Sequence, residues 1–242
     1  MIEATHRKSF CGITLYGIAL MSNRATQRDA CSSPPRDAVR LQAPSFPILT
    51  FDETSLTPSL GYLFNNKWLY PCESLISILW KFERANALTG IVVARLLGPE
   101  IDPYEGVVPD RGSLDLHRLR DEFRLPREAL RRAVPEQSGR RRFSGVFRYC
   151  RRCLGKGYHS VVHQFEDLSL CPAHHCGLES ICRRCGREVS YRVNVQLLEA
   201  QYRCANCLVR LGSNVWSPAN AEPMRPAHRK AFTRRYFERC QR

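Results

Sequence analysis

The sequence predicts an α+β fold in which a mostly α N-terminal helix-turn-helix region precedes two tandem zinc-ribbon-like modules. Two observations predict it. Apolar side chains recur at helical spacing between residues 71 and 134, and four close pairs of metal-ligand residues follow between residues 150 and 207. A chain of 242 residues can bury a modest core, so one or two domains are expected.

Composition divides the chain into four predicted segments. Residues 1–45 lack apolar periodicity and contain serine and proline clusters, so they are predicted to form a flexible leader whose ordering entropy nothing offsets. Residues 46–142 are predicted to form the helical helix-turn-helix region, and residues 143–212 the tandem zinc-ribbon modules. Residues 213–242 are predicted to be a basic C-terminal tail.

Two helices are predicted first in the helical region. Leu75, Leu79 and Phe82 recur on one face at helical spacing, with a proline just ahead of them. A second helix is predicted from Ile91 to Leu96, and the Gly98-Pro99 pair is predicted to end it. The stretch that follows is rich in proline and glycine, which predicts a loop.

A second pair of helices is predicted to form the helix-turn-helix. Ser113 is predicted to cap a helix whose apolar face includes Leu119 and Phe123, and Pro126 to begin a helix that carries Leu130. Small helical bundles share this outline with DNA-binding helix-turn-helix motifs. The arginines on and after the last helix favour DNA contact at Arg127, Arg131, Arg132, Arg140, Arg141 and Arg142.

Excess basic charge is confined to the second part of the chain. Residues 1–110 hold 10 basic and 11 acidic side chains, whereas residues 111–242 hold 27 basic and 12 acidic ones. This asymmetry favours a polyanionic partner, most simply nucleic acid. An arginine-biased genome is the alternative, since only five of the 37 basic residues are lysine, but such a bias would not explain the uneven distribution.

Four pairs of metal-ligand residues each have two residues between their members. A structural Zn²⁺ site takes four sulfur or nitrogen ligands in a tetrahedron, usually two from each of two turns. Two structural zinc ions are therefore predicted, with 17 and 18 residues between the paired turns. The first would use Cys150, Cys153, Cys171 and His174, and the second Cys182, Cys185, Cys204 and Cys207.

The other cysteines and histidines are given ordinary roles. His175 is an alternative to His174, but its spacing matches the other pairs less well. Cys176 is predicted to be a small buried side chain beside the first site, and His159 and His163 to be packing or surface residues.

A short hairpin is predicted between the two turns of each module. In the second module Tyr191, Val193 and Val195 alternate with polar residues, as a strand would require. Close cysteine pairs favour metal over disulfide, so the protein is predicted to be reduced and cytoplasmic. Association with the nucleoid is predicted separately, as the location that goes with DNA contact.

No transmembrane helix is predicted, because no run of 18 apolar residues is present. Residues 10–21 are largely apolar and follow two basic residues, as in a secretory signal, but a threonine and two glycines interrupt them and no A-x-A cleavage site follows. Met21 is an alternative to Met1 as the first residue.

Two sets of residues resemble the TniQ family, whose opening segment is also seen in TnsD proteins. The first set lies in the first predicted helix and just before it: Pro71, Glu73, Ser74, Leu75, Ser77, Trp80, Arg84 and Asn86. The second set surrounds the metal-ligand pairs: Tyr149-Cys150-x-x-Cys153-Leu154, Cys171-Pro172-x-His174-x-Cys176-x-Leu178 and Cys182-x-x-Cys185-Gly186. The resemblance covers roughly residues 60–212.

The resemblance implies a non-enzymatic accessory protein of transposition. TniQ-like proteins combine a helix-turn-helix region with zinc ribbons and help to choose the insertion site. The implied partners are DNA, the transposon AAA+ ATPase (TnsC/TniB-like), a targeting complex and a second copy of the chain, with no membrane. Arg151, Arg183 and Leu208 depart from the family pattern without removing a ligand. The lack of a large region after the second site favours the short, adaptor-like type.

Two alternative functions remain. The first is a stand-alone zinc-containing DNA-binding transcriptional regulator. The second is a zinc enzyme, which the pattern disfavours because a catalytic zinc keeps a ligand position open. Gly155-Lys156 lacks the earlier glycine of a phosphate-binding loop, and no catalytic residue or organic cofactor site is predicted.

Overall fold

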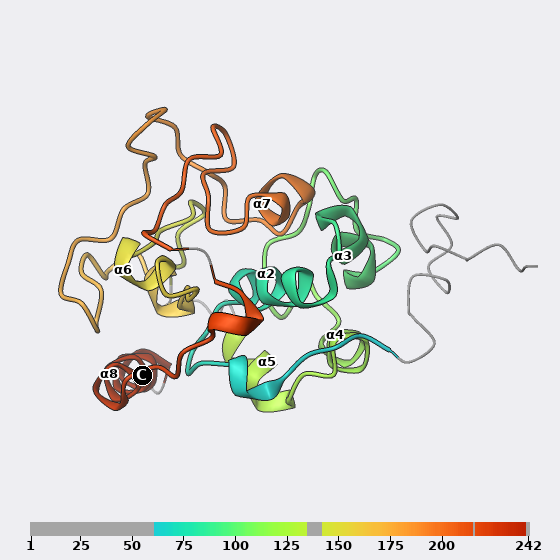
Figure 1. The fold of residues 1–242 in the computed structure, drawn as a ribbon, viewed down its shortest axis with the longest axis horizontal. Coiled ribbons are helices and arrows are strands. Elements are labelled where there is room, and N and C mark those ends of the chain that lie inside the picture. Colours follow the sequence, from blue (N-terminus) through green and yellow to red (C-terminus); the bar gives the residue numbers. More distant parts are fainter. Residues whose placement is uncertain (1–60, 135–141, 215, 241–242) are drawn as a thin grey trace, which may run out of the picture. The chain divides into compact units, whose positions relative to one another are not determined.

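Short helices joined by long loops make up the computed structural model, which describes residues 61–134, 142–214 and 216–240 (Figure 1). Within these residues, isolated antiparallel β-bridges are present in place of extended strands. The helical elements are η2 (Asn66–Trp68), α2 (Leu75–Asn86), α3 (Gly90–Leu97), α4 (Leu116–Phe123), α5 (Arg127–Ala133), α6 (Arg151–Leu154), η3 (Val161–Gln164), α7 (Val195–Glu199), η4 (Pro218–Asn220) and α8 (Pro226–Cys240).

The two helices predicted first in the chain are present as α2 and α3. Ser74 caps α2, because its hydroxyl oxygen accepts a hydrogen bond from the backbone N–H of Ser77. The helix ends where Ala87 adopts a left-handed conformation with φ of 51°. Gly90 begins α3 and lies so close to α7 that a Cβ there would be 2.9 Å from the Cβ of Leu198. Close packing of α3 on α7 therefore requires a glycine.

The next helix begins later than predicted. Asp115, and not Ser113, caps α4, with its carboxylate accepting from the backbone N–H groups of His117 and Arg118 at 2.8 and 3.1 Å. A carboxylate can accept both bonds at once, which favours it over a single hydroxyl two residues earlier. Arg124 then adopts a φ of 50°, so the chain turns tightly into α5, which packs against α4.

One hydrophobic core joins the helical region to the cysteine-rich region. Trp80 lies at its centre, with its ring centroid 4.9 Å from that of Tyr202 and 5.8 Å from that of Phe147. The Trp80 indole N–H also donates to the backbone carbonyl of Leu197 at 2.9 Å. Helix α2 is thus covered on one side by residues that follow it by more than sixty positions.

The prediction of a hairpin between the metal-binding turns is wrong in both modules. The first module carries the short helix η3, and Val195 begins helix α7 with Asn194 as its cap. Val193 forms a bridge with Val107, and Ser190 with Val146. The alternating residues therefore pair with segments outside their own module, which local alternation cannot reveal.

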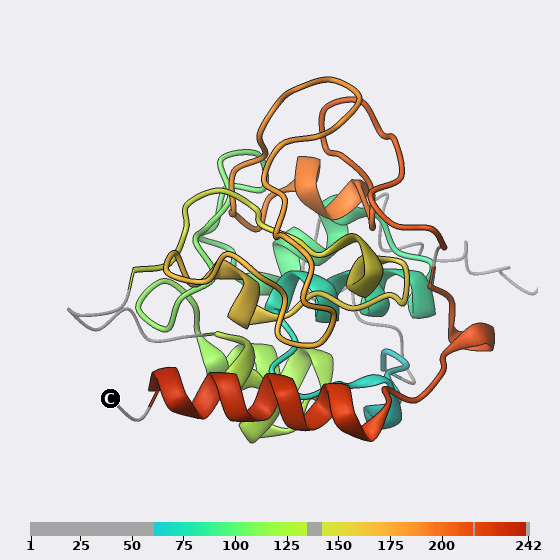
Figure 2. The ribbon, with the colours of Figure 1, turned by 90° about the vertical axis from the view of Figure 1, so that its left-hand side faces the viewer.

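The basic C-terminal segment contains a 15-residue helix, α8. Phe232 and Tyr236, one turn apart, are buried in a second core with Tyr158, Val162 and Phe165. Figure 2 shows α8 running along one side of the molecule, in red.

None of the described helices has the length and apolarity needed to span a bilayer.

Candidate metal centres and basic surface

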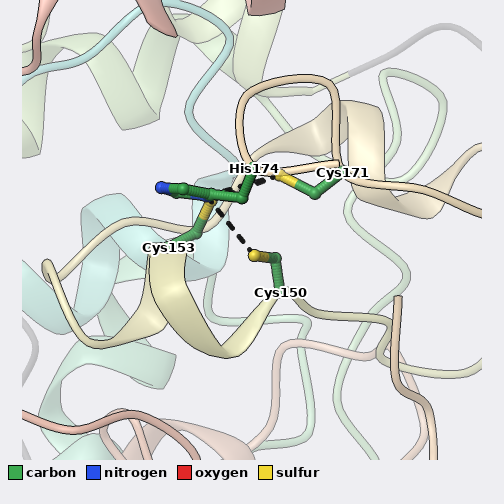
Figure 3. Close-up of side chains that lie close together, drawn as sticks. All are labelled: Cys150, Cys153, Cys171 and His174. Atoms are coloured by element: carbon green, nitrogen blue, oxygen red, sulfur yellow. Dashed lines mark hydrogen bonds between the residues drawn. The ribbon is translucent and has the colours of Figure 1, made fainter. Parts of the chain in front are cut away.

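The first four predicted ligands converge from two turns. Cys150 is the cap of helix α6 and Cys153 lies within it, so this first turn is helical. Cys171 and His174 lie in a second turn, which the bridge between Leu170 and Gly177 closes. The side chains of all four point toward one centre in Figure 3.

Distances in this first cluster match those of a tetrahedral metal site. The His174 Nδ1 atom lies 3.5 Å from the sulfur of Cys150, 3.3 Å from that of Cys153 and 3.6 Å from that of Cys171. The sulfurs of Cys153 and Cys171 are 3.7 Å apart. Tetrahedral Zn²⁺ with its usual bond lengths sets ligand separations of about 3.5–3.8 Å. The donor set and its spacing therefore fit zinc.

The second cluster is formed by Cys182, Cys185, Cys204 and Cys207. The sulfur of Cys182 lies 3.6 Å from that of Cys207, and the sulfur of Cys185 lies 3.7 Å from that of Cys204. All four sulfurs lie within 4.8 Å of one another. This arrangement also fits a four-coordinate Zn²⁺ site.

Each turn of the second cluster closes through a left-handed residue after its second cysteine. Gly186 and Leu208 have φ of 69° and 57°, and their N–H groups donate to the carbonyls of Cys182 and Cys204, each at 2.8 Å. Leucine at such a φ is strained, whereas glycine is not. The departure from the family's glycine at Leu208 thus strains one turn without displacing a ligand.

One cysteine of each cluster is clearly shifted toward its thiolate form, whereas burial raises the pKa of Cys153 and of Cys204. In the first, hydrogen bonds from Cys150 and Cys153 lower the pKa of Cys171 far below its usual value. In the second, burial raises the pKa of Cys182, but backbone N–H groups of Cys185 and Arg184 outweigh burial and bring it to about 6. Thiolates are the form that binds metal.

Cys176, His163 and His175 are near the ligands of the first cluster in sequence or in space. Cys176 is half-buried, with its sulfur 3.4 Å from that of Cys150. His163 is fully buried, with Nε2 3.9 Å from the sulfur of Cys153, whereas His175 is exposed. The location predicted for Cys176 beside the first site is thus confirmed, although the side chain is only half-buried.

The second neighbouring histidine, His159, joins the cluster region to α2. It is buried, and its Nδ1 lies 2.7 Å from the hydroxyl oxygen of Ser74. The backbone N–H of Ser74 donates to the carbonyl of His159 at 2.9 Å, and the N–H of His159 donates to the hydroxyl of Ser77 at 3.1 Å. Of the packing and surface roles predicted for His159 and His163, the structure shows packing, because both side chains are buried.

A buried ion pair explains why an acidic residue, Glu73, is present in the Pro-x-Glu-Ser-Leu segment, residues 71–75. The Glu73 carboxylate lies 2.6 Å from the Lys81 ammonium, and both side chains are fully enclosed. Ser77 donates its hydroxyl proton to Glu73 at 2.6 Å, and Lys81 donates to the carbonyl of Trp68 at 2.7 Å. Burial raises the pKa of Glu73 and lowers that of Lys81, while each charge stabilises the other. Sequence reasoning missed Lys81, whose signal was a lone lysine in an apolar helix.

The predicted DNA-contact residues are only partly within the described chain. Arg127 and Arg131 are exposed on α5, and Arg142 is exposed after it. Arg132 is half-buried, paired with Glu128 at 2.9 Å. Arg140 and Arg141 lie outside the described residues.

Comparison with known proteins identifies one region. Residues 68–178 match the family model of TniQ, a family associated with transposition. The match begins just before α2, spans the first cluster and ends before the second. No curated protein matches the chain.

Proposed function

Because the chain belongs to the TniQ family over residues 68–178, we propose that it is an accessory protein of DNA transposition. It helps to select the target site by linking target DNA, or a targeting complex, to the transposon AAA+ ATPase. The family match is the observation that carries this proposal. The protein itself neither cuts nor joins DNA.

The metal clusters serve this function as scaffolding. Each cluster offers four ligands, which fill the tetrahedron of a structural Zn²⁺ and leave no open position for a reacting water. Bound zinc would hold together segments that lack extended strands. We therefore expect two zinc ions per chain, measured by elemental analysis of the purified protein.

DNA contact is assigned to the basic second half of the chain. Helix α5 presents exposed Arg127 and Arg131 beside α4, and the net charge of the whole chain is +14. Guanidinium groups bind phosphate oxygens strongly, so such a surface suits a DNA backbone.

Affinity purification together with the products of neighbouring genes tests the proposal. The tagged protein is expected to retain an AAA+ ATPase from a soluble mixture, and more of it when duplex DNA and ATP are present. A Cys204→Ser variant, which removes one ligand of the second cluster, reports whether the metal scaffold is needed. Tight binding to one promoter without ATPase retention would overturn the adaptor role and support a transcriptional regulator.

A further inference from the structure

Helix α5 is flanked by two hollows with basic rims. Between α4 and α5 lies a groove of about 240 Å³, lined by Arg120, Arg127 and Arg131 among others. Between α5 and α8 lies a larger groove of about 590 Å³. In Figure 1, α5 lies between α8 and α4. The helix is thus a ridge with positive charge on both sides.

Three basic residues of α8 line the larger groove. Arg229, Lys230 and Arg234 are exposed and belong to its wall. Arg234 pairs with Glu238 at 2.7 Å, whereas no carboxylate within the described parts of the chain pairs with Arg229 or Lys230. This wall therefore carries uncompensated positive charge.

The carboxylates of the same groove are already neutralised. Glu128 on the α5 side pairs with Arg132 at 2.9 Å. Glu73 at the floor is fully enclosed and pairs with Lys81 at 2.6 Å. The net charge offered to a ligand at this groove is positive, which disfavours a basic partner and suits a polyanion.

Helix α8 holds its basic residues in fixed positions. Phe232 is buried, with its ring 5.0 Å from that of Tyr158. Near its end, Arg239 pairs with Asp167 at 2.5 Å, and Phe237 lies 5.5 Å from the Arg132 guanidinium of α5. The charges of α8 thus lie on a docked helix, whose position relative to α5 is set by packing.

We propose that α5 enters the major groove of target DNA and that α8 contacts one of the two flanking backbones through Arg229, Lys230 and Arg234. The other backbone is contacted by the arginines of the groove between α4 and α5. This inference rests on the proposed DNA binding. A major groove is about 12 Å wide and is bordered by phosphates on both sides, so it matches a helical ridge between two basic walls. The proposal thereby places DNA contacts on α8, a helix outside residues 68–178 of the family match.

Fluorescence anisotropy with a labelled 30-base-pair duplex of mixed sequence tests the assignment across a range of NaCl concentrations. The test variant is R229Q/K230Q/R234Q. The matched control, R184Q/R187Q/R203Q, removes the same charge from exposed positions around the second cluster. Circular dichroism and zinc content establish that both variants fold.

Each lost phosphate contact is expected to reduce the slope of log K against log salt by about 0.9. Between 1 M and 0.1 M salt, a slope of 0.9 corresponds to about an eightfold change in affinity, so the loss of each contact should lower the affinity at 0.1 M about eightfold relative to that at 1 M. The α8 variant should therefore lose up to about three units of slope, whereas the control should lose much less.

Equal slopes and affinities for the two variants would overturn the assignment to α8 while leaving DNA binding intact. A wild-type protein without salt-dependent DNA binding would overturn both this inference and the DNA-binding part of the proposed function.

Discussion

At the scale of single residues, the charges enclosed by α2 determine how the Pro-x-Glu-Ser-Leu segment is held. Glu73 has hydrogen bonds from Ser77 and from the backbone of Tyr70 besides its ion pair with Lys81. Such a pair is stable only while both members are present, because a lone buried charge has lost its hydration.

Replacing Lys81 is therefore expected to be severe. Lys81→Met would leave Glu73 enclosed without its partner and should lower the free energy of unfolding by about 3–5 kcal/mol. Urea denaturation measures this loss. The double variant E73Q/K81M should recover part of it, since no uncompensated charge remains. A double variant as unstable as K81M would contradict this explanation.

Glu83 makes stability depend on pH. Burial raises its pKa from 4.5 to about 9, and its second carboxylate oxygen has no hydrogen-bond partner in the described parts of the chain. The folded state therefore keeps a proton that the unfolded state releases above pH 4.5. Since the folded state then binds more protons, this group lowers stability as the pH rises from about 4.5 to 9.

The variant Glu83→Gln removes this titration while keeping an acceptor for the Gln201 amide, which donates to Glu83 at 2.8 Å. At pH 8 it should raise the free energy of unfolding by about 1–3 kcal/mol, and near pH 5 it should have little effect. Thermal melts at a series of pH values check this. A gain of equal size at both pH values would rule out the titration of Glu83 as its cause.

At the scale of elements, the contact between α3 and α7 depends on the absence of a side chain at Gly90. Gly90→Ala would place a Cβ 2.9 Å from Leu198 and 3.1 Å from the backbone nitrogen of Glu199. Alanine favours helix by itself, but a clash with backbone must move α7.

We expect Gly90→Ala to lower the free energy of unfolding by about 1–3 kcal/mol, measured by chemical denaturation. Gly145→Ala is the matched control, because nothing lies within 4 Å of a Cβ at that exposed position. The control should stay within about 0.5 kcal/mol of wild type. If both variants behaved alike, the close approach of α7 would not be the reason for the glycine.

The elements that sequence predicted well are those set by local pattern. The apolar spacing of Leu75, Leu79 and Phe82 is a property of α2 alone, and spacing alone grouped the eight ligand candidates. Val193 was assigned to a local hairpin, whereas it pairs with Val107, far away in sequence, and Val195 begins helix α7. Phe232 and Tyr236 have helical spacing, but the surrounding arginines made the segment look like a tail.

At the scale of the whole molecule, α8 is docked beside the first cluster. The ring of His228 on α8 lies 4.8 Å from that of His174, and Phe232 lies 5.6 Å from His163, whose Nε2 approaches Cys153. Loss of the first metal should therefore loosen α8, whereas loss of the second should not.

Trypsin cleavage tests this coupling. We expect Cys171→Ser to speed cleavage within α8, at Arg229, Lys230 or Arg234, by about tenfold or more, because local opening exposes the backbone. Cys204→Ser removes a ligand of the second cluster and serves as the control. Mass spectrometry of the early fragments locates the cuts. Equal cleavage of α8 in both variants would show that the two clusters stabilise it alike.

The position of Trp80 has a consequence for protein engineering. Since its ring packs on Phe147 and Tyr202, a chimera that exchanged only the metal-binding half would replace the wall of its own core. Recombination between relatives should therefore fail at junctions between α2 and the second cluster. The helices from α2 onward and the cysteine turns should therefore be exchanged, and inherited, only as one unit.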